Sequence, residues 1–267
     1  MFHLFDFEHA TNNYTSRLLS HFLYNQGMSK SPRMKNRPSF LLALLLAAGL
    51  GWLLYRFVKA ETVSLKDSPP PKPVIVSREE WRARPLNLEA PEEFGLFDPQ
   101  TNPNGVLYYP SDLSAVLNTV VVHHSAIPNA GPAEIQSLQM DGRGFADVAY
   151  HFMIAKDGTI YEGRELNIRG AHVQGFNTGS VGIVLLGNFN EEQPSESQLN
   201  SLRGLVDYLR YTYGIRYLAG HKDYPDQSPD GTECPGDNLY PLLPDLAREL
   251  GMKYGIDGYV GPDGSNH

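Results

Sequence analysis

The chain has 267 residues, 41% of them hydrophobic, which gives room for one large or two small domains and enough apolar material for a core. Its formal net charge of −8 is unevenly distributed: residues 1–60 carry seven Lys or Arg against two Asp or Glu (net +5), and the remainder carries fifteen against twenty-eight (net −13). This acidic body excludes nucleic acid as a partner. A single cysteine excludes an internal disulfide.

Residues 34–60 have the layout of a signal peptide or signal anchor. Basic residues precede sixteen uncharged, mainly apolar residues, 40–55. This run is short for a membrane span, which needs about 20 residues, and slightly long for the roughly 7–15 apolar residues of a signal peptide. Cleavage after Ala60 and retention of residues 40–58 as a membrane-contacting anchor therefore both remain open. Either interpretation predicts that residues 61–267 are exported, to the periplasm or another extracytoplasmic space.

The segments around this signal divide the rest of the chain. Residues 1–33 are expected to be an N-terminal extension without structure, because a start at Met34 would give the usual order of basic and then apolar residues. The Pro-rich residues 61–75 predict an extended linker. The Gly-rich residues 251–267 predict a flexible tail. Residues 76–250 are left as one folded domain.

Within this domain, predicted strands alternate with predicted helices. The β-branched run 118–124 and the segment 180–187 predict buried strands. A capping box and apolar residues at helical spacing predict a helix over 195–213, and Asp157-Gly158 predicts a hairpin. The other expected elements are a short helix opened by a capping box at 77–80, a helix at 132–140, a strand at 217–220 and a helix at 241–250. The pattern predicts a single α/β domain with a central mixed β-sheet flanked by helices.

The single cysteine, Cys234, lies in a loop rich in Gly, Pro and Asp. Outside the cytoplasm an unpaired thiol is open to oxidation, and coordination to a metal would protect it. Because neighbouring strand residues point to opposite faces, only one of His123 and His124 can join His221 in such a site. The histidines available to it are His123, His124, His151, His172 and His221. Two histidines and a cysteine with an open fourth position describe a catalytic zinc site. A cysteine nucleophile is the alternative.

Five segments, in order, resemble the N-acetylmuramoyl-L-alanine amidase family, which includes peptidoglycan recognition proteins and phage lysozymes that act as amidases. They are VSREEWRARP (76–85), VVVHHSA (120–126), IQSLQMDGRGFADVAYHFMIAKDGTIYEGR (135–164), GAHVQGFNTGSVGIVLLGNF (170–189) and GHKDYPDQSPDGTECPGDNLYPLL (220–243). The resemblance covers residues 76–250. It implies a Zn²⁺-dependent hydrolase that cleaves the amide bond between N-acetylmuramic acid and L-alanine in peptidoglycan. We expect the protein to be a monomer.

The resemblance also implies the metal ligands. His123, His221 and Cys234 occupy the positions of the family's zinc ligands. This resolves the choice between the neighbouring histidines in favour of His123. Family members without the cysteine bind peptidoglycan without cutting it, so the presence of Cys234 favours an active enzyme.

Four further positions match functional residues of the family. Tyr150 matches a catalytic tyrosine, and Thr232 stands at a catalytic position that is lysine in the phage enzymes and threonine in the active recognition proteins. A threonine there can donate a hydrogen bond but adds no positive charge. His172 and Asn177 match residues that line the glycan–peptide groove in relatives.

For the other polar side chains we expect structural roles. His124 and His151 are expected to satisfy hydrogen bonds within the fold, and Glu162 is expected to form an ion pair with Arg164. The aspartates after His221, Asp223 among them, are expected to lie in solvated turns, because their loop is rich in turn residues.

Two alternatives to an exported zinc amidase remain. The first is a peptidoglycan-binding module with the same groove and little catalysis, which the absence of lysine at position 232 keeps open. The second is a cysteine peptidase that uses Cys234 and a histidine without metal. It is disfavoured because Pro235-Gly236 does not form the helix N-terminus that commonly activates such a thiol.

Overall fold

The computed structural model describes residues 49–53, 69–93, 108–109, 112–225 and 231–256. Its contacts divide the chain into two units, residues 1–68 and residues 69–267. In the first unit residues 49–53 are helical, and the remainder of the predicted extension, of the export segment and of the linker up to residue 68 lies outside the described residues. No helix in the described part of the chain is long and apolar enough to cross a membrane.

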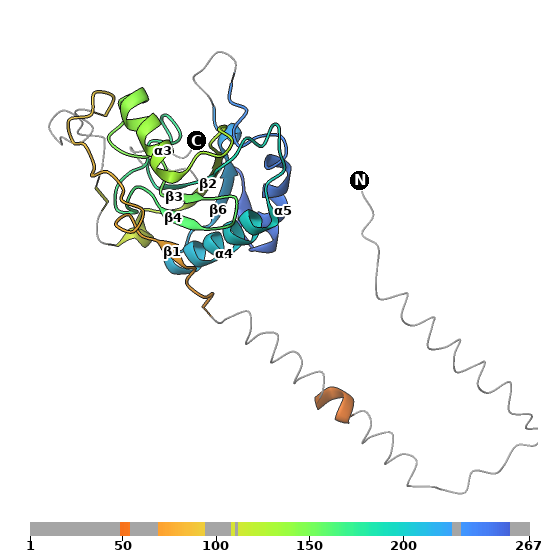
Figure 1. Cartoon of the computed structure of the whole chain (residues 1–267). Helices are drawn as coiled ribbons and strands as arrows, with labels where there is room; N and C mark the ends of the chain where they lie inside the picture. The colour runs from red at the N-terminus through yellow and green to blue at the C-terminus, as the bar shows by residue number, and fades with distance from the viewer. Residues whose placement is uncertain (1–48, 54–68, 94–107, 110–111, 226–230, 257–267) are drawn as a thin grey trace, which may run out of the picture. The chain divides into compact units, whose positions relative to one another are not determined.

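The second unit is built around a mixed sheet of seven strands in the order β1-β4-β3-β5-β2-β6-β7 (Figure 1). At its centre, β2 (Thr119–His124) runs parallel to β5 (Ser180–Leu185) and to β6 (Tyr217–Gly220). Every residue of β2 and β5 is buried, which agrees with the apolar runs at their centres. The predicted mixed sheet is confirmed.

Shorter strands complete the sheet on both sides of this centre. β3 (Phe152–Ile154) pairs with β5 in parallel and with β4 (Ile160–Glu162) in antiparallel, which confirms the hairpin predicted at Asp157-Gly158. The edges are β1 (Ile75–Val76) beside β4 and β7 (Lys253–Tyr254) beside β6.

Helices lie on both faces of the sheet (Figure 1). α4 (Glu196–Tyr213) and α5 (Leu243–Glu249) pack on one face and form the main hydrophobic core with the central strands. α3 (Pro132–Ser137), followed by a π-helical turn at Leu138–Gly142, packs on the other face through Ile135.

The longest helix, α4, begins and ends where the sequence indicates. The Ser195 hydroxyl accepts the Gln198 backbone N–H at 3.0 Å, and the Gln198 side chain accepts the Ser195 N–H at 3.1 Å, which completes the capping box. The helix ends at Gly214, whose φ of 69° is left-handed. Its buried apolar residues lie on the sheet, so the predicted amphipathic helix is confirmed.

The capping box at residues 77–80 forms, but the predicted short helix does not. The backbone N–H and the hydroxyl of Ser77 donate to the Glu80 carboxylate at 2.7 and 2.8 Å, yet residues 78–82 form only turns. Arg82 has a φ of 59°, a left-handed conformation that stops a helix after its first turn. Trp81 anchors this arm, because its indole N–H donates to the Glu162 carbonyl at 2.8 Å.

The sheet also extends beyond residue 250, where the sequence predicts a flexible tail. Lys253–Tyr254 form β7, and Met252 is buried against the main core. A two-residue strand has too few residues to show a period in sequence, so no pattern marks it. Residues 251–256 therefore belong to the fold, and residues 257–267 lie outside the described residues.

Candidate metal centre

The three predicted metal ligands meet at the C-terminal edge of the sheet. His123 is the second-to-last residue of β2. His221 begins a 3₁₀ turn (η3, His221–Asp223) directly after β6. Cys234 lies in the loop before a second 3₁₀ turn (η4, Tyr240–Leu242). Because β2 and β6 are adjacent and parallel, their C-terminal ends lie side by side. One ligand atom from each of the three side chains lies within 4.8 Å of the other two.

The donor atoms fit a tetrahedral metal ion. The Nδ1 of His123 is 3.5 Å from the Sγ of Cys234, and the rings of His123 and His221 have centroids 4.7 Å apart. Nitrogen and sulfur ligands of one tetrahedral Zn²⁺, at about 2.1 and 2.3 Å, would lie about 3.6 Å from each other. Burial, together with the neighbouring histidines, holds the pKa of His123 well below its usual value, so the imidazole is neutral, as a ligand must be.

The surroundings of Cys234 favour a metal ligand over a free nucleophile. Its Sγ accepts the backbone N–H of His124 at 3.4 Å. Burial nevertheless raises the pKa of the Cys234 thiol to about 12, while that hydrogen bond and the charge of Lys222 act in the opposite direction. Since the thiolate is the attacking form of a cysteine, a thiol that the charge of Lys222 does not ionise at neutral pH is unsuited to a cysteine peptidase. A bound metal ion would supply the stronger positive charge that the thiolate form needs.

A chain of hydrogen bonds runs from His123 away from the other ligands. If Nδ1 of His123 binds a metal, Nε2 carries the proton and donates it to His172 Nδ1 at 3.1 Å. His172 Nε2 then donates to the Ser180 hydroxyl at 3.3 Å, and Ser180 donates to the carbonyl of Asn177 at 2.9 Å. Such a partner behind a ligand fixes the tautomer and orientation of the metal-binding ring.

His172 is thus placed behind a ligand, with only 6% of its surface exposed. Its ring packs closely on Gly182, where a Cβ would lie 2.5 Å from the imidazole, so glycine is needed at that position of β5. From this position the His172 ring can orient the ring of His123 through their hydrogen bond. Its predicted contact with substrate stays a prediction.

Tyr150 packs beside both His123 and His172. Its ring centroid is 5.0 Å from that of His123, and the residue lines a small pocket of about 60 Å³ with Gln139 and Arg143. Burial and the neighbouring Cys234 raise the pKa of Tyr150, and the side chain of Gln139 opposes this through a hydrogen bond. The phenol therefore remains protonated at neutral pH and is available as a hydrogen-bond donor.

The backbone that carries Tyr150 is held from behind by Arg164, a residue to which the sequence gives no such role. Arg164 donates from Nε to the Val148 carbonyl at 3.0 Å and from its backbone N–H to the Tyr150 carbonyl at 2.8 Å. Its guanidinium makes two hydrogen bonds of 2.9 Å to the Glu93 carboxylate. Both charged residues are buried, with 1% of Arg164 and 3% of Glu93 exposed.

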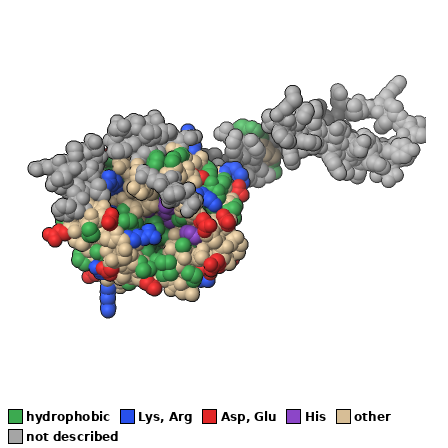
Figure 2. Space-filling view, turned by 90° about the horizontal axis from the view of Figure 1, so that it is seen from above, with side chains coloured by type: hydrophobic (Ala, Val, Ile, Leu, Met, Phe, Trp, Pro, Cys, Tyr) green, Lys and Arg blue, Asp and Glu red, His purple; other side chains and the backbone are tan. Residues whose placement is uncertain are grey.

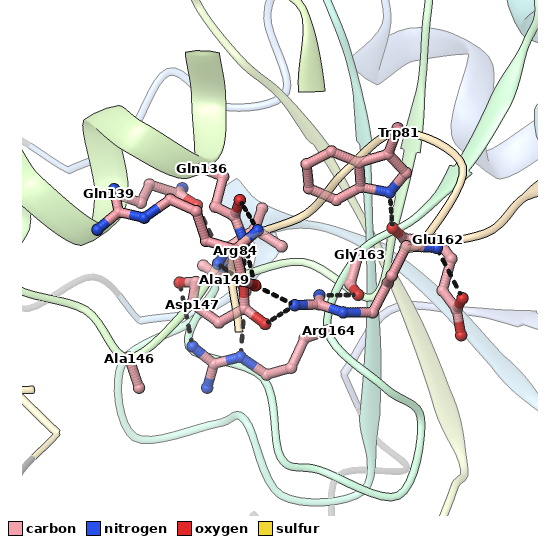
Figure 3. Close-up of polar contacts among 12 residues, drawn as sticks. Trp81, Arg84, Gln136, Gln139, Ala146, Asp147, Ala149, Glu162, Gly163 and Arg164 are labelled. Atoms are coloured by element: carbon pink, nitrogen blue, oxygen red, sulfur yellow. Dashed lines mark hydrogen bonds and ion pairs between the residues drawn. The ribbon is translucent and has the colours of Figure 1, made fainter. Parts of the chain in front are cut away.

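Asp147 forms a second ion pair and also contacts Arg164, because the Asp147 backbone carbonyl accepts a hydrogen bond from the Arg164 guanidinium at 3.3 Å (Figure 3). Asp147 pairs with Arg78 at 2.8 Å and accepts a hydrogen bond from Gln136 at 2.6 Å. Arg78 also uses its backbone N–H to bind the carboxylate of Glu162 at 3.2 Å. The predicted pair between Glu162 and Arg164 is therefore wrong. The network joins the N-terminal arm to the segment that carries Tyr150, just before β3.

Thr232 and Asn177 both bind the backbone of the loops on which they lie. The Thr232 hydroxyl accepts the N–H of Cys234 at 3.2 Å. The side-chain oxygen of Asn177 accepts the N–H groups of His172 and Val173, each at 2.8 Å. These bonds hold the loops beside the cluster. The predicted contacts of Thr232 and Asn177 with substrate stay predictions.

The two histidines outside the cluster have the expected structural roles. The ring of His124 lies on the opposite face of the sheet from His123, where its Nδ1 accepts the N–H of Phe189 at 3.2 Å. His151 accepts the N–H of Gly182 at 3.0 Å, and its Nε2 is 3.0 Å from the Ile168 carbonyl. Histidine side chains are visible on the face of the molecule that Figure 2 shows. His221 and Cys234 are each half-buried, which gives the centre access to solvent.

This arrangement defines an α/β protein with a candidate His-His-Cys metal centre at the edge of a mixed sheet. The family model described as N-acetylmuramoyl-L-alanine amidase matches residues 113–237, a range that contains all three ligands. Peptidoglycan-recognition protein SC2 of Drosophila simulans is 33% identical over 138 residues, which are 49% of this chain and 74% of that protein. The chain belongs to the N-acetylmuramoyl-L-alanine amidase family.

The proteins similar to this chain include both enzymes and recognition proteins. The N-acetylmuramoyl-L-alanine amidase of Sus scrofa is 30% identical over 148 residues, which are 50% of this chain but only 24% of that protein. A mutant of Drosophila PGRP-LB, solved in complex with tracheal cytotoxin, is 27% identical with a TM-score of 0.50 and covers 64% of this chain and 92% of its own. The chain thus spans about a quarter of the pig amidase.

Proposed function

We propose that this protein is a zinc-dependent N-acetylmuramoyl-L-alanine amidase that cleaves the amide bond between N-acetylmuramic acid and L-alanine in peptidoglycan. The observation that carries the proposal is the convergence of His123, His221 and Cys234, with the Nδ1 and Sγ atoms 3.5 Å apart. A module that only binds peptidoglycan would not need these three metal ligands. Peptidoglycan as the partner is supported by the family and by the complex of a PGRP-LB mutant with tracheal cytotoxin.

The chain's own residues supply binding, orientation and charge stabilisation. His123, His221 and Cys234 would hold the zinc ion, with a fourth position open. When bound, zinc activates water and polarises the scissile carbonyl. Tyr150, protonated and beside His123, is placed to donate a hydrogen bond to the oxygen on which negative charge develops. His172 keeps the ring of His123 in the orientation that its ligand role requires.

The proposal includes export. Residues 34–60 would direct the domain across a membrane, either as a cleaved signal or with residues 40–58 as an anchor in the bilayer, and residues 61–75 would act as a spacer between this segment and the domain. The protein would act as a monomer on the cell wall. Its acidic body cannot be attracted electrostatically to an acidic wall polymer, so recognition would depend on short-range contacts in the groove.

The test of this function is product analysis on intact peptidoglycan. We expect the full-length protein to release stem peptides with a free L-alanine amino terminus, identified by mass spectrometry. A chelator should abolish this release and added Zn²⁺ should restore it. Binding to peptidoglycan without any released peptide in the presence of zinc would contradict the enzyme and support the binding module. Release that is insensitive to the chelator would instead support a cysteine peptidase.

Tyr150→Phe should separate catalysis from metal binding. The variant loses one hydroxyl, and we expect kcat to fall about 100-fold because an oxyanion donor is typically worth 10²–10³ in rate. Zinc content, measured by elemental analysis, should be unchanged because Tyr150 is no ligand. Tyr161→Phe, on β4, is the matched control and should retain full activity. Equal kcat for wild type and Tyr150→Phe would remove the tyrosine from the mechanism.

A further inference from the structure

Asp223 lies two residues after His221 and takes no part in the mechanism above. It does not lie in a solvated turn, as the sequence suggests, because its carboxylate accepts three hydrogen bonds. One oxygen accepts the Gly220 N–H at 2.7 Å and the Tyr254 hydroxyl at 2.8 Å. The other accepts the hydroxyl of Tyr240. The carboxylate therefore joins three segments that are separate in sequence: the turn η3, the turn η4 and the edge strand β7.

These bonds surround the backbone of His221. The bond from Gly220 to Asp223 closes the 3₁₀ turn at its start, and the N–H of Tyr224 donates to the His221 carbonyl at 3.1 Å at its end. The ring of Tyr240 lies so close to Gly220 that a Cβ there would be 2.9 Å from it. The backbone that carries the His221 ring is thus fixed on both sides.

The same cluster links His221 to Cys234. The backbone N–H of Lys222 donates to the Cys234 carbonyl at 2.9 Å, which joins the two ligand segments directly. The Lys222 ammonium lies 4.5 Å above the ring of Tyr240 and 3.2 Å from the Asp237 carboxylate. Movement of Tyr240 or of the turn would therefore change the separation of the two ligands.

We propose that Asp223, Tyr240 and Tyr254 form a clamp that positions His221 relative to Cys234 and so sets the zinc affinity of the centre. The inference rests on the proposed metal site. It makes β7 part of the metal centre, although β7 contributes no ligand. Tyr254 and Tyr240 are positioning residues, which act on the metal only through the carboxylate of Asp223 and the turn that it closes.

The physical basis is the sensitivity of metal binding to ligand placement. Three ligands bind one ion tightly only if they are already held near their bound positions, since otherwise binding must also order them. Changes to groups that orient ligands typically lower metal affinity about 10–100-fold. Among these three groups, Tyr254 permits the most conservative change, because phenylalanine keeps the ring and removes only the hydroxyl that binds Asp223.

The experiment measures the zinc dissociation constant of the full-length protein by competition with a chromophoric chelator. We expect Tyr254→Phe to raise this constant about 10-fold and Asp223→Asn to raise it by 10- to 100-fold. The double variant with both Tyr254→Phe and Asp223→Asn should bind zinc no more weakly than Asp223→Asn alone, because both changes break the same clamp. Tyr211→Phe, an exposed tyrosine of α4, is the matched control and should bind zinc as wild type does.

Metal-free melting temperatures separate positioning from simple loss of stability. Zinc affinity is measured where every variant is folded, so a residue that only stabilises the fold would lower the melting temperature without changing the dissociation constant. That result for Tyr254→Phe would overturn the clamp while leaving the proposed function intact. A wild-type protein that binds no zinc would overturn the metal site itself. If Asp223→Asn fails to fold, Tyr254→Phe still decides the question.

Discussion

Cys234→Ser is expected to remove both the bound zinc and the amidase activity. Wild-type protein should contain about one zinc per chain, as expected for a single three-ligand site. Serine replaces a thiolate ligand with a hydroxyl that does not ionise at neutral pH, and a site left with two histidines cannot hold zinc tightly. We expect zinc affinity to fall by more than about 100-fold, beyond the effect of changing an orienting group. Elemental analysis of the purified protein and release of stem peptides from peptidoglycan measure the two losses.

The neighbouring histidine provides the matched control for this prediction. His124→Asn changes a residue adjacent to a ligand, but its ring lies on the other face of the sheet and binds the Phe189 N–H. Asparagine can still accept that hydrogen bond, so zinc content should remain about one per chain. Full zinc content and activity in Cys234→Ser would place the metal elsewhere. Loss of zinc in His124→Asn but not in His123→Asn would show that the other histidine of the pair is the ligand.

The centre of the fold could be predicted from sequence because local patterns and tertiary structure agree there. The β-branched run before His123 predicts a buried strand, and the capping box at Ser195 marks the start of α4 to the residue. The ends of parallel strands gather at one edge, which already brings His123 and His221 together. The choice of His123 over its neighbour needed the resemblance to a known family, since alternation allows either.

The contacts that hold this centre in place could not be predicted in the same way. Glu93 and Arg164 are 71 positions apart, and Asp223 and Tyr254 are 31 apart. Neither pair shows a spacing that a helix or strand would explain. The sequence favours the nearby Glu162 as the partner of Arg164, but the Arg164 guanidinium binds the carboxylate of Glu93 instead. Short elements such as β7 exist only because neighbouring segments bind them, so their own residues carry no signal.

Arg164→Met is expected to cause the largest loss of stability of any change outside the core. The substitution leaves the carboxylate of Glu93 buried without its partner and removes the hydrogen bond to the Val148 carbonyl. Breaking a buried ion pair by removing one partner typically costs about 3–5 kcal/mol. That is a large part of the roughly 5–15 kcal/mol that stabilises a typical domain. Urea unfolding of the full-length protein, followed by tryptophan fluorescence, measures this change.

A surface pair and a double variant give this prediction its controls. Arg203 and Glu249 form an ion pair with 42% and 53% of their side chains exposed, so Arg203→Met should change stability by less than about 1 kcal/mol. The double variant Glu93→Leu with Arg164→Met leaves no unpaired charge, and it should be more stable than Arg164→Met alone. If Arg164→Met, Arg203→Met and the double variant all unfold at the same urea concentration, the buried pair does not stabilise the fold.

Because Arg164 also binds the Tyr150 carbonyl through its backbone, any folded fraction of Arg164→Met should keep the tyrosine near His123. Its kcat per folded molecule should then fall less than that of Tyr150→Phe.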